Sequence, residues 1–466
     1  MDLFRKKSLT AVLGGDTNKL NKTLGAFDLT ALGVGAVIGT GIFVVTGVAA
    51  AEHAGPGIIL SFILAGIACV LSALCYSELA SALPVSGSAY AYSYVAFGEL
   101  LAWILGWDLV LEYGVAVAAV GSGWSGYIQG LLEGFGLHLP TLLSGAYNSD
   151  KGTFIDLPAV VIILLISMLL TRGAKETARF NAIMVVIKLA VVLLFIFTGI
   201  FYIKPENWSP FLPFGMHGVM NGAATVFFAY IGFDAISNAA EEVKSPQRDI
   251  PIGIISSVVI CTVLYISVSL VLTGIVPYYD LNVSDPVSYA LRLVDQNGIA
   301  GLISLGAITG MTTVLLVMMY GQTRLLYAIS RDGLLPKSLS KVNSVTQQPN
   351  RSIWMMGIVS AILTGFVPLS RLANLTSIGT LFAFLVVSIG VVALRYSQPT
   401  LKRGFKVPWV PFLPLLSAAA CGYLMYNLGS ATWIGFLIWL VIGLLIYALY
   451  GYRNSKLSAD YSRNDK

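Results

Sequence analysis

Residues 29–51 form an apolar run that carries no charged side chain and is interrupted by glycine. Gly33, Gly35, Gly39 and Gly41 fall within nine positions of it. The run is long enough to cross a bilayer, which takes about 20 apolar residues in a helix. Glycine disfavours the helical conformation, so we expect this helix to unwind midway. Because unwound backbone at membrane depth must be buried in protein or line a cavity, the run predicts a binding site near the bilayer midplane.

The composition indicates that the chain is an integral membrane protein. Of its 466 residues, 56% are hydrophobic and only 11% are charged, whereas soluble domains carry about 25% charged residues. The first apolar run follows a polar stretch and is too long for the core of a signal peptide, so no cleavable signal is predicted. The four cysteines lie inside apolar runs and the three histidines are far apart. They give no reason to expect a disulfide, a metal site or a cofactor.

Twelve apolar runs predict an all-α integral membrane protein with twelve transmembrane helices. The runs are 27–51, 57–83, 97–130, 157–170, 179–202, 214–240, 252–275, 297–331, 353–367, 375–397, 409–428 and 432–452. An even number of spans puts both termini on one side of the membrane. The connections on that side hold most of the lysines and arginines, whereas the opposite connections hold only Lys151, Lys204, Arg292 and Arg371. The positive-inside rule then predicts a multi-pass protein of the cell membrane with both termini in the cytoplasm.

The sixth run is also interrupted, because Gly232 stands beside Asp234 deep within apolar sequence. Interrupted helices at positions 1 and 6 are the pattern expected of two inverted five-helix repeats. The predicted organisation comprises a cytoplasmic N-terminal tail (1–26), a first repeat (27–202), a second, inverted repeat (203–397), two peripheral helices (398–452) and a cytoplasmic C-terminal tail (453–466).

The two interruptions offer opposite partial charges. A half-helix that starts near residues 39–41 presents free N–H groups and a positive dipole end, which suit a carboxylate. The carbonyls of residues 228–231 end the first half of the sixth run and suit an ammonium group. Facing each other, the two ends would bind a zwitterion, which points to an α-amino acid. Two simpler interpretations stay open: a close helix-packing contact at Gly35 and Gly39, and an aromatic packing stripe with a glycine kink.

Lys188 lies in the middle of the fifth run, about 13 Å along a helix from Arg179. An ionisable residue inside a membrane is a functional candidate by default. Burial favours the neutral amine, so we expect Lys188 to gain and lose a proton during a transport cycle. The alternative is a lysine whose ammonium extends to the cytoplasmic interface.

Carboxylates give two further candidates. Asp108 and Glu112 are four residues apart, which places both on one face of the third predicted helix. Glu112 is the deeper candidate for a proton or for the substrate amine, whereas Asp108 suits a structural hydrogen bond equally well. Near the cytoplasmic ends, Glu78 and the pair at 241–242 are expected to form ion pairs with arginine or lysine, and such pairs could act as a gate.

Several segments resemble the amino acid–polyamine–organocation (APC) superfamily, and within it the cationic amino acid transporter group with its bacterial ApcT-like members. These segments are 33–43 (GVGAVIGTGIF), 76–80 (YSELA), 84–90 (PVSGSAY), 106–113 (GWDLVLEY), 227–234 (FFAYIGFD) and 241–251 (EEVKSPQRDIP). The resemblance covers nearly the whole chain. It implies the LeuT-like fold, with two inverted five-helix repeats, broken helices 1 and 6, and two extra helices.

The resemblance also implies a substrate site and a coupling residue. The substrate carboxylate would meet the backbone at Gly39, Thr40 and Gly41. The amine would meet the carbonyls of Ile38, Phe228, Ala229 and Ile231. Sodium-driven relatives hold an ion between helices 1 and 8, whereas a helix 5 lysine takes that place in ApcT-like members; Lys188 matches this lysine and implies proton coupling. Met318 would face the side-chain pocket, where a bulky residue favours small substrates.

We therefore predict a secondary active transporter that takes up α-amino acids by alternating access, with proton symport. The expected partners are an L-amino acid, a proton and the lipid bilayer, without nucleic acid, in a monomeric or weakly associated protein. An exchanger or a membrane amino-acid sensor with the same pocket is the alternative, although the short tails disfavour a sensor. A channel is disfavoured because continuous polar helix faces are lacking, and an enzyme because no catalytic constellation is evident.

Overall fold

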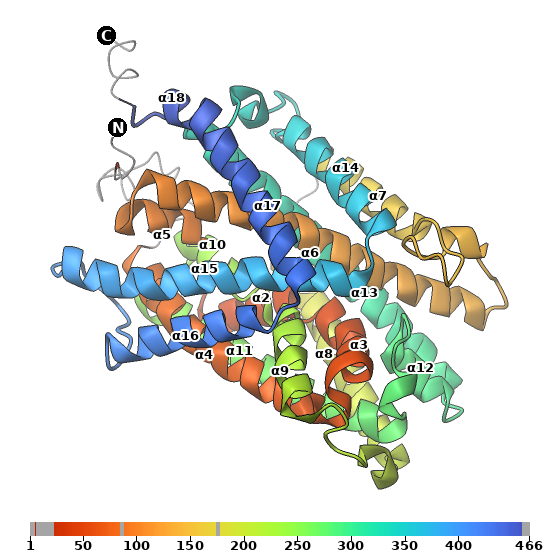
Figure 1. Ribbon diagram of the computed structural model, residues 1–466. Helices are drawn as coiled ribbons and strands as arrows, with labels where there is room; N and C mark the ends of the chain where they lie inside the picture. The colour runs from red at the N-terminus through yellow and green to blue at the C-terminus, as the bar shows by residue number, and fades with distance from the viewer. Residues whose placement is uncertain (1–4, 6–22, 84–87, 174–177, 459–466) are drawn as a thin grey trace.

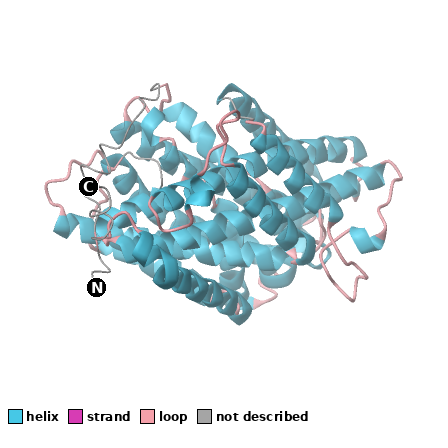
Figure 2. Ribbon diagram, turned by 90° about the horizontal axis from the view of Figure 1, so that it is seen from above, coloured by secondary structure: helices cyan, strands magenta, loops and turns pink. Residues whose placement is uncertain are grey.

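The computed structural model describes residue 5 and residues 23–83, 88–173 and 178–458. In this part of the chain the regular structure is entirely helical, and β-pairing is limited to isolated bridges. Figures 1 and 2 show the helices packed side by side, with short loops at the two ends of the bundle. The predicted tails and the first part of the segment 84–90 fall largely outside the described residues.

The α-helices follow the predicted runs along the chain. They are α2 (Ala26–Val37), α3 (Thr46–Ala49), α4 (Ile58–Ala82), α5 (Ser88–Ala96), α6 (Glu99–Gly134), α7 (Leu157–Thr171), α8 (Ala178–Gly199), α9 (Gly215–Val226), α10 (Ala235–Asn238), α11 (Pro246–Ile275), α12 (Pro286–Arg292), α13 (Asn297–Arg331), α14 (Asn350–Phe366), α15 (Leu369–Ser397), α16 (Phe412–Tyr426), α17 (Ser430–Ile446) and α18 (Tyr452–Asn454). Three π-helical segments are η1 (Gly41–Val45), η2 (Ala50–Ala54) and η11 (Tyr447–Gly451). The short 3₁₀ segments are η3 (Gly55–Gly57), η4 (Thr141–Leu143), η5 (Ile200–Tyr202), η6 (Pro205–Trp208), η7 (Phe227–Tyr230), η8 (Ala240–Glu242), η9 (Tyr278–Asp280) and η10 (Lys337–Ser340).

The helices have the length and apolar character of membrane spans. Among the described residues, eight helical stretches are long and apolar enough to cross a membrane, and α2, α7 and α16 are shorter apolar helices. An all-helical, multi-pass membrane protein is therefore confirmed, while the number of twelve spans stays a prediction. The apolar runs did not predict α5 and α12, which are short and interleave polar residues with apolar ones.

The interrupted sixth run lies in the interior, and the last long helical stretch is much less buried. Within Gly215–Ser237, 83% of the most apolar 18-residue stretch is buried. Within Ser430–Asn454, only 22% of the corresponding stretch is buried. The outer side chains of α17 are large and apolar, which suits contact with lipid tails. In Figure 1, α16 lies beside α15 and α4, while α17 crosses the bundle on the outside.

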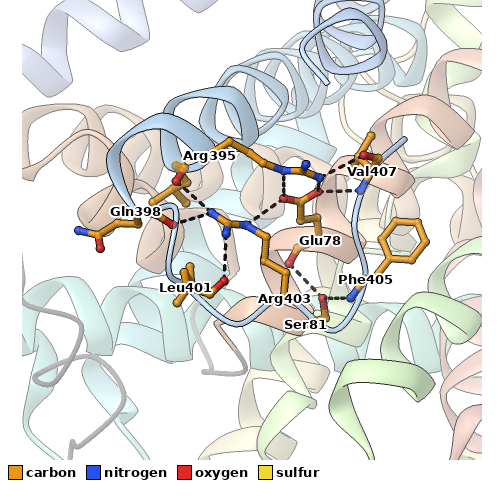
Figure 3. A network of polar contacts seen from close by, with 9 residues as sticks. Glu78, Ser81, Arg395, Gln398, Leu401, Arg403, Phe405 and Val407 are labelled. Carbon is orange, nitrogen blue, oxygen red and sulfur yellow. Dashed lines mark hydrogen bonds and ion pairs between the residues drawn. The ribbon is translucent and has the colours of Figure 1, made fainter. Parts of the chain in front are cut away.

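A buried carboxylate joins α4 to the last turn of α15 and to the segment that follows it (Figure 3). Arg395 donates two hydrogen bonds to the Glu78 carboxylate, at 2.8 and 2.7 Å, and Arg403 lies 3.2 Å from it. The backbone amide of Val407 adds a bond of 2.7 Å. The predicted pairing of Glu78 with arginine is confirmed, and it fixes the loop that leads to α16. The side chain of Glu241 lies outside the described residues.

Candidate functional site

The first interruption falls at residues 38–40, where the sequence places it. Helix α2 ends at Val37, Ile38 has an extended backbone with ψ of 104°, and π-helical turns begin at Gly41. Within the described part of the chain, the amides of Gly39 and Thr40 donate no backbone hydrogen bond, and the Ile38 carbonyl accepts none. The prediction that this helix unwinds midway is therefore confirmed.

The second interruption falls between α9 and α10. After α9 the chain tightens into η7, Ile231 is extended with ψ of 135°, and Gly232 has a φ of +118°. The Phe228 carbonyl accepts the Ile231 amide at 3.3 Å, so this end is one turn of 3₁₀ helix. The Ile231 carbonyl accepts no hydrogen bond from the residues that the structure describes. It is thus a free acceptor at the end of a half-helix.

The two interruptions pack directly against each other. A Cβ atom on Gly41 would lie 2.4 Å from the Ala229 Cα, and one on Gly232 would lie 3.0 Å from the Ala36 carbonyl oxygen. Real Cβ contacts are essentially never below 3.0 Å. Glycine at these two positions therefore allows the unwound segments to meet, in addition to allowing each to unwind.

A small cavity lies where the two interruptions meet. Its lining comes from α2, the segment 39–41, α6, the 228–231 segment and α13. The lining residues are Ala36, Val37, Gly39, Thr40, Gly41, Ala116, Val120, Phe228, Ile231, Val314 and Met318. Thr40 is the one lining residue with a polar side chain, and its hydroxyl donates to the Met311 sulfur at 3.2 Å. The cavity wall is otherwise apolar side chain and backbone.

Most of the predicted site residues converge on this cavity. Its lining includes Gly39, Thr40, Gly41, Phe228, Ile231 and Met318, whereas Ile38 and Ala229 lie just behind it. Glu112 does not line the cavity: it is buried against α15, with its Cβ 3.7 Å from the position of a Cβ on Gly379. Its predicted contact with a substrate amine therefore stays a prediction, and this geometry gives it no support.

Asp108 lies in the same contact between α6 and α15. It is completely buried, and neither carboxylate oxygen has a hydrogen-bond partner among the described residues. Gly379 allows this close approach, because a Cβ there would lie 3.0 Å from one Asp108 oxygen. The suggested structural hydrogen bond of Asp108 is absent from this part of the chain.

Tyr265 on α11 is a site residue that the sequence reasoning missed. Its hydroxyl lies 2.6 Å from the Ala229 carbonyl and 3.1 Å from the Val37 carbonyl. One side chain thus contacts both interruptions. A tyrosine hydroxyl within the apolar run 252–275 was the signal available, because a buried tyrosine needs a hydrogen-bond partner. The wall residues Ala116, Val120 and Val314 gave no such signal.

Lys188 is buried beside the first interruption. Its side chain is 1% exposed, and Nζ donates to the Gly35 carbonyl of α2 at 2.7 Å. The alternative of a lysine that extends to the cytoplasmic interface is therefore wrong. The ammonium and the segment 38–40 are separated by less than one helical turn of α2.

Comparison with known proteins identifies the chain's relatives. The amino acid permease family model matches residues 24–454. A methylthioribose transporter of Bacillus subtilis (strain 168) is 56% identical, over 98% of this chain and 99% of the relative. The branched-chain amino acid permease BcaP of the same organism is 52% identical, with the same two coverages. A vacuolar cationic amino acid transporter of Arabidopsis thaliana, number 4, is 32% identical over 98% of this chain and 96% of its own length.

These relationships cover the interrupted helices, the cavity and Lys188 together. They agree with the helical, apolar architecture. The chain therefore belongs to the amino acid permease family of the APC superfamily, and it is a membrane transporter of small molecules and not an enzyme.

Proposed function

We propose that this protein takes up α-amino acids with apolar side chains by proton-coupled symport. The observation that carries the proposal is the meeting of two interrupted helices at one cavity. The amides of Gly39 and Thr40 at this cavity are free to bind a carboxylate. The carbonyls of Ile38 and Ile231 are free to bind an ammonium group.

Fewer carbonyls are unoccupied at the ammonium end of the site than the family resemblance implied. The carbonyls of Phe228 and Ala229 already accept hydrogen bonds, from the Ile231 amide and the Tyr265 hydroxyl respectively. Ile38 and Ile231 retain unoccupied acceptors among the described residues. We therefore assign the substrate amine first to these two carbonyls.

The apolar wall supports a preference for apolar side chains. Ala116 and Val120 of α6 and Val314 and Met318 of α13 offer no charged or hydrogen-bonding group to a substrate side chain. The name of one relative, the branched-chain amino acid permease BcaP of Bacillus subtilis, is consistent with a small aliphatic substrate.

Lys188 supports proton coupling because its titratable amine contacts the first interrupted helix directly. In the charged state its ammonium donates to the Gly35 carbonyl, which holds α8 against α2. Loss of the proton would remove the charge that strengthens this bond, since charge-assisted hydrogen bonds are roughly twice as strong as neutral ones. Movement of α2 could then be linked to the proton and to the substrate together.

The wider arrangement is part of the same proposal. We place the protein in the cell membrane with both termini in the cytoplasm, with spans 1–5 and 6–10 as inverted repeats of the LeuT-like fold and with broken helices 1 and 6. The spacing of the two interruptions and the distribution of basic residues support this arrangement. The two final helices are peripheral, and the protein is expected to act as a monomer or in weak association.

A second candidate substrate is methylthioribose, because the relative at 56% identity is named a transporter of it. A methylthio group would suit the same apolar wall. Methylthioribose has no charge, however, and would leave the amides at residues 39–40 without an anionic partner. We therefore rank it below an amino acid.

Competition for uptake of labelled L-leucine into proteoliposomes tests the proposal. We expect L-isoleucine and L-valine to compete strongly, and L-leucine methyl ester and N-acetyl-L-leucine to lose about tenfold or more in affinity. Each derivative lacks one charged end, and a charged hydrogen bond is worth about 1.5–3 kcal/mol. Strong competition by both derivatives, or by methylthioribose alone, would contradict the zwitterion site.

A further inference from the structure

Gly310 of α13 lies directly beneath the side chain of Lys188. A Cβ atom on Gly310 would be 3.0 Å from the Lys188 Cγ, 3.1 Å from Cε and 3.5 Å from Cδ. Three methylene groups of the lysine therefore run along bare backbone of α13. The same side chain ends at the Gly35 carbonyl of α2, so it passes between three helices.

We propose that Gly310 is a positioning residue for proton coupling. Because Gly310 has no side chain, α13 leaves a groove at this position. The stem of Lys188 lies in the groove, and its ammonium reaches the Gly35 carbonyl. This inference rests on the proposed role of Lys188 as the proton-coupling residue. It adds a residue on a third helix, one that has no polar side chain and touches neither the cavity nor the proton.

The neighbouring glycine of the same helix pair serves a different contact. Gly306 lies one turn earlier on α13, and a Cβ there would be 2.2 Å from Cγ2 of Val191 on α8. Both glycines therefore bring α13 close to α8, as small residues do at helix contacts in membranes. Gly306 meets an apolar side chain, whereas Gly310 meets Lys188. A methyl group at Gly306 thus crowds the same pair of helices, and more severely, without meeting the lysine.

Titratable groups of the neighbouring helices also lie near the lysine. From α11, the Cys261 thiol is close enough to interact electrostatically with Lys188, and the Tyr265 hydroxyl lies at the adjoining interruption. The charged residues of α13 are Arg324 and Arg331, at least 14 positions and about 21 Å along the helix from Gly310. The carbonyl of Gly35 is thus one polar acceptor of the ammonium, and its distance from Nζ depends on the path of the stem.

A methyl group at position 310 has a defined consequence. Contacts of 3.0–3.1 Å are too short for carbon atoms, so the lysine stem would shift by a few tenths of an ångström. The shift lengthens the bond from Nζ to the Gly35 carbonyl, and the ammonium loses part of its stabilisation. We expect the Gly310→Ala variant to reach half-maximal uptake at a lower pH than the parent protein. We expect its proton-driven uptake to fall about tenfold, the scale of one charge-assisted hydrogen bond.

The experiment compares three alanine variants in proteoliposomes. Gly310→Ala is the test, Gly306→Ala controls for crowding between α8 and α13, and Gly301→Ala controls for the gain in helix propensity because nothing lies within 4 Å of its Cβ. Uptake of labelled L-leucine driven by a pH gradient is measured from pH 5 to 8. Exchange of labelled for unlabelled leucine at equal pH, which needs the site but no net proton movement, is measured in parallel. Only Gly310→Ala should lower the ratio of driven uptake to exchange and shift the pH profile.

A double variant keeps the test decisive if Gly310→Ala folds poorly. Lys188→Ala removes the stem, so the methyl group at position 310 then enters vacated space. We expect Gly310→Ala to lower the unfolding temperature of the parent protein and to leave that of Lys188→Ala unchanged or higher, which is a non-additive pair. Equal effects in both backgrounds, or a pH profile matching that of Gly306→Ala, would overturn the role of Gly310.

Failure of the underlying proposal looks different. If the parent protein exchanges leucine but shows no uptake driven by a pH gradient, proton coupling itself is wrong, whatever Gly310→Ala does. If the parent couples to protons and loses this coupling in Lys188→Ala, while Gly310→Ala behaves like Gly301→Ala, the assignment of Gly310 alone is wrong.

Discussion

The glycines at the centre of this protein have different structural roles. Gly39 lies in the unwound segment, and Gly41 and Gly232 allow the two interruptions to touch. Gly310 packs against the side-chain methylenes of Lys188. Gly33, by contrast, stays inside helix α2, where it packs against Ile236 and Ser257. A glycine-rich sequence therefore marks both flexible backbone and close approach, and the contact across the helices decides which applies.

Gly232 is the residue at which we expect substitution to cost most. Its φ of +118° is a conformation that L side chains rarely adopt, and a Cβ would press on the Ala36 carbonyl. Strain of this kind costs about 1–3 kcal/mol. Gly232→Ala should lower the unfolding temperature of the detergent-solubilised protein and weaken leucine binding. Gly298→Ala, at a position with open space around it, should change neither; equal stability of the two variants would contradict this account.

At the scale of elements, α11 contacts both interrupted helices, and the end of α15 with the segment after it is bound to α4. The hydroxyl of Tyr265 in α11 lies within hydrogen-bond distance of carbonyls in both interruptions, and both are far from it in the sequence. Glu78 of α4 binds two arginines from the chain beyond position 394 (Figure 3). Both contacts join segments that are far apart in the sequence.

Breaking the Glu78 contact should loosen that attachment. Glu78 is 1% exposed, so Glu78→Gln would leave Arg395 and Arg403 with a weaker, uncharged partner in a buried place. Removing one member of a buried ion pair costs about 3–5 kcal/mol. We expect a clear fall in unfolding temperature, with fluorescence from a label on the 398–411 loop reporting greater mobility. Glu52→Gln, at an exposed position, is the control; stability equal to the control would show that the network is dispensable.

Sequence and structure agree where a property is local. The apolar runs gave the helices, and glycine in the first and sixth runs located the two interruptions. Contacts between distant segments were not predictable: nothing in the sequence placed Tyr265 beside Ala229, or turned Glu112 toward α15 and away from the cavity. Helices α5 and α12 were not predicted because short elements with mixed polarity have no strong periodic pattern.

At the scale of the whole molecule, the cavity lies where the two interrupted helices meet α6 and α13. Substrate binding at the two interruptions would connect α2 to α9, and Lys188 connects α2 to α8 and α13. One interrupted helix is thus shared by the proposed substrate site and the proposed proton site. This sharing is what would make proton and amino acid cross the membrane together.

The most direct test of this coupling is accumulation of labelled L-leucine in proteoliposomes under an imposed pH gradient, compared between the parent protein and Lys188→Ala. Our account predicts accumulation above the external concentration in the parent, its collapse when a protonophore removes the gradient, and no accumulation in Lys188→Ala although exchange at equal pH persists. Accumulation by Lys188→Ala with full dependence on the pH gradient would contradict the account.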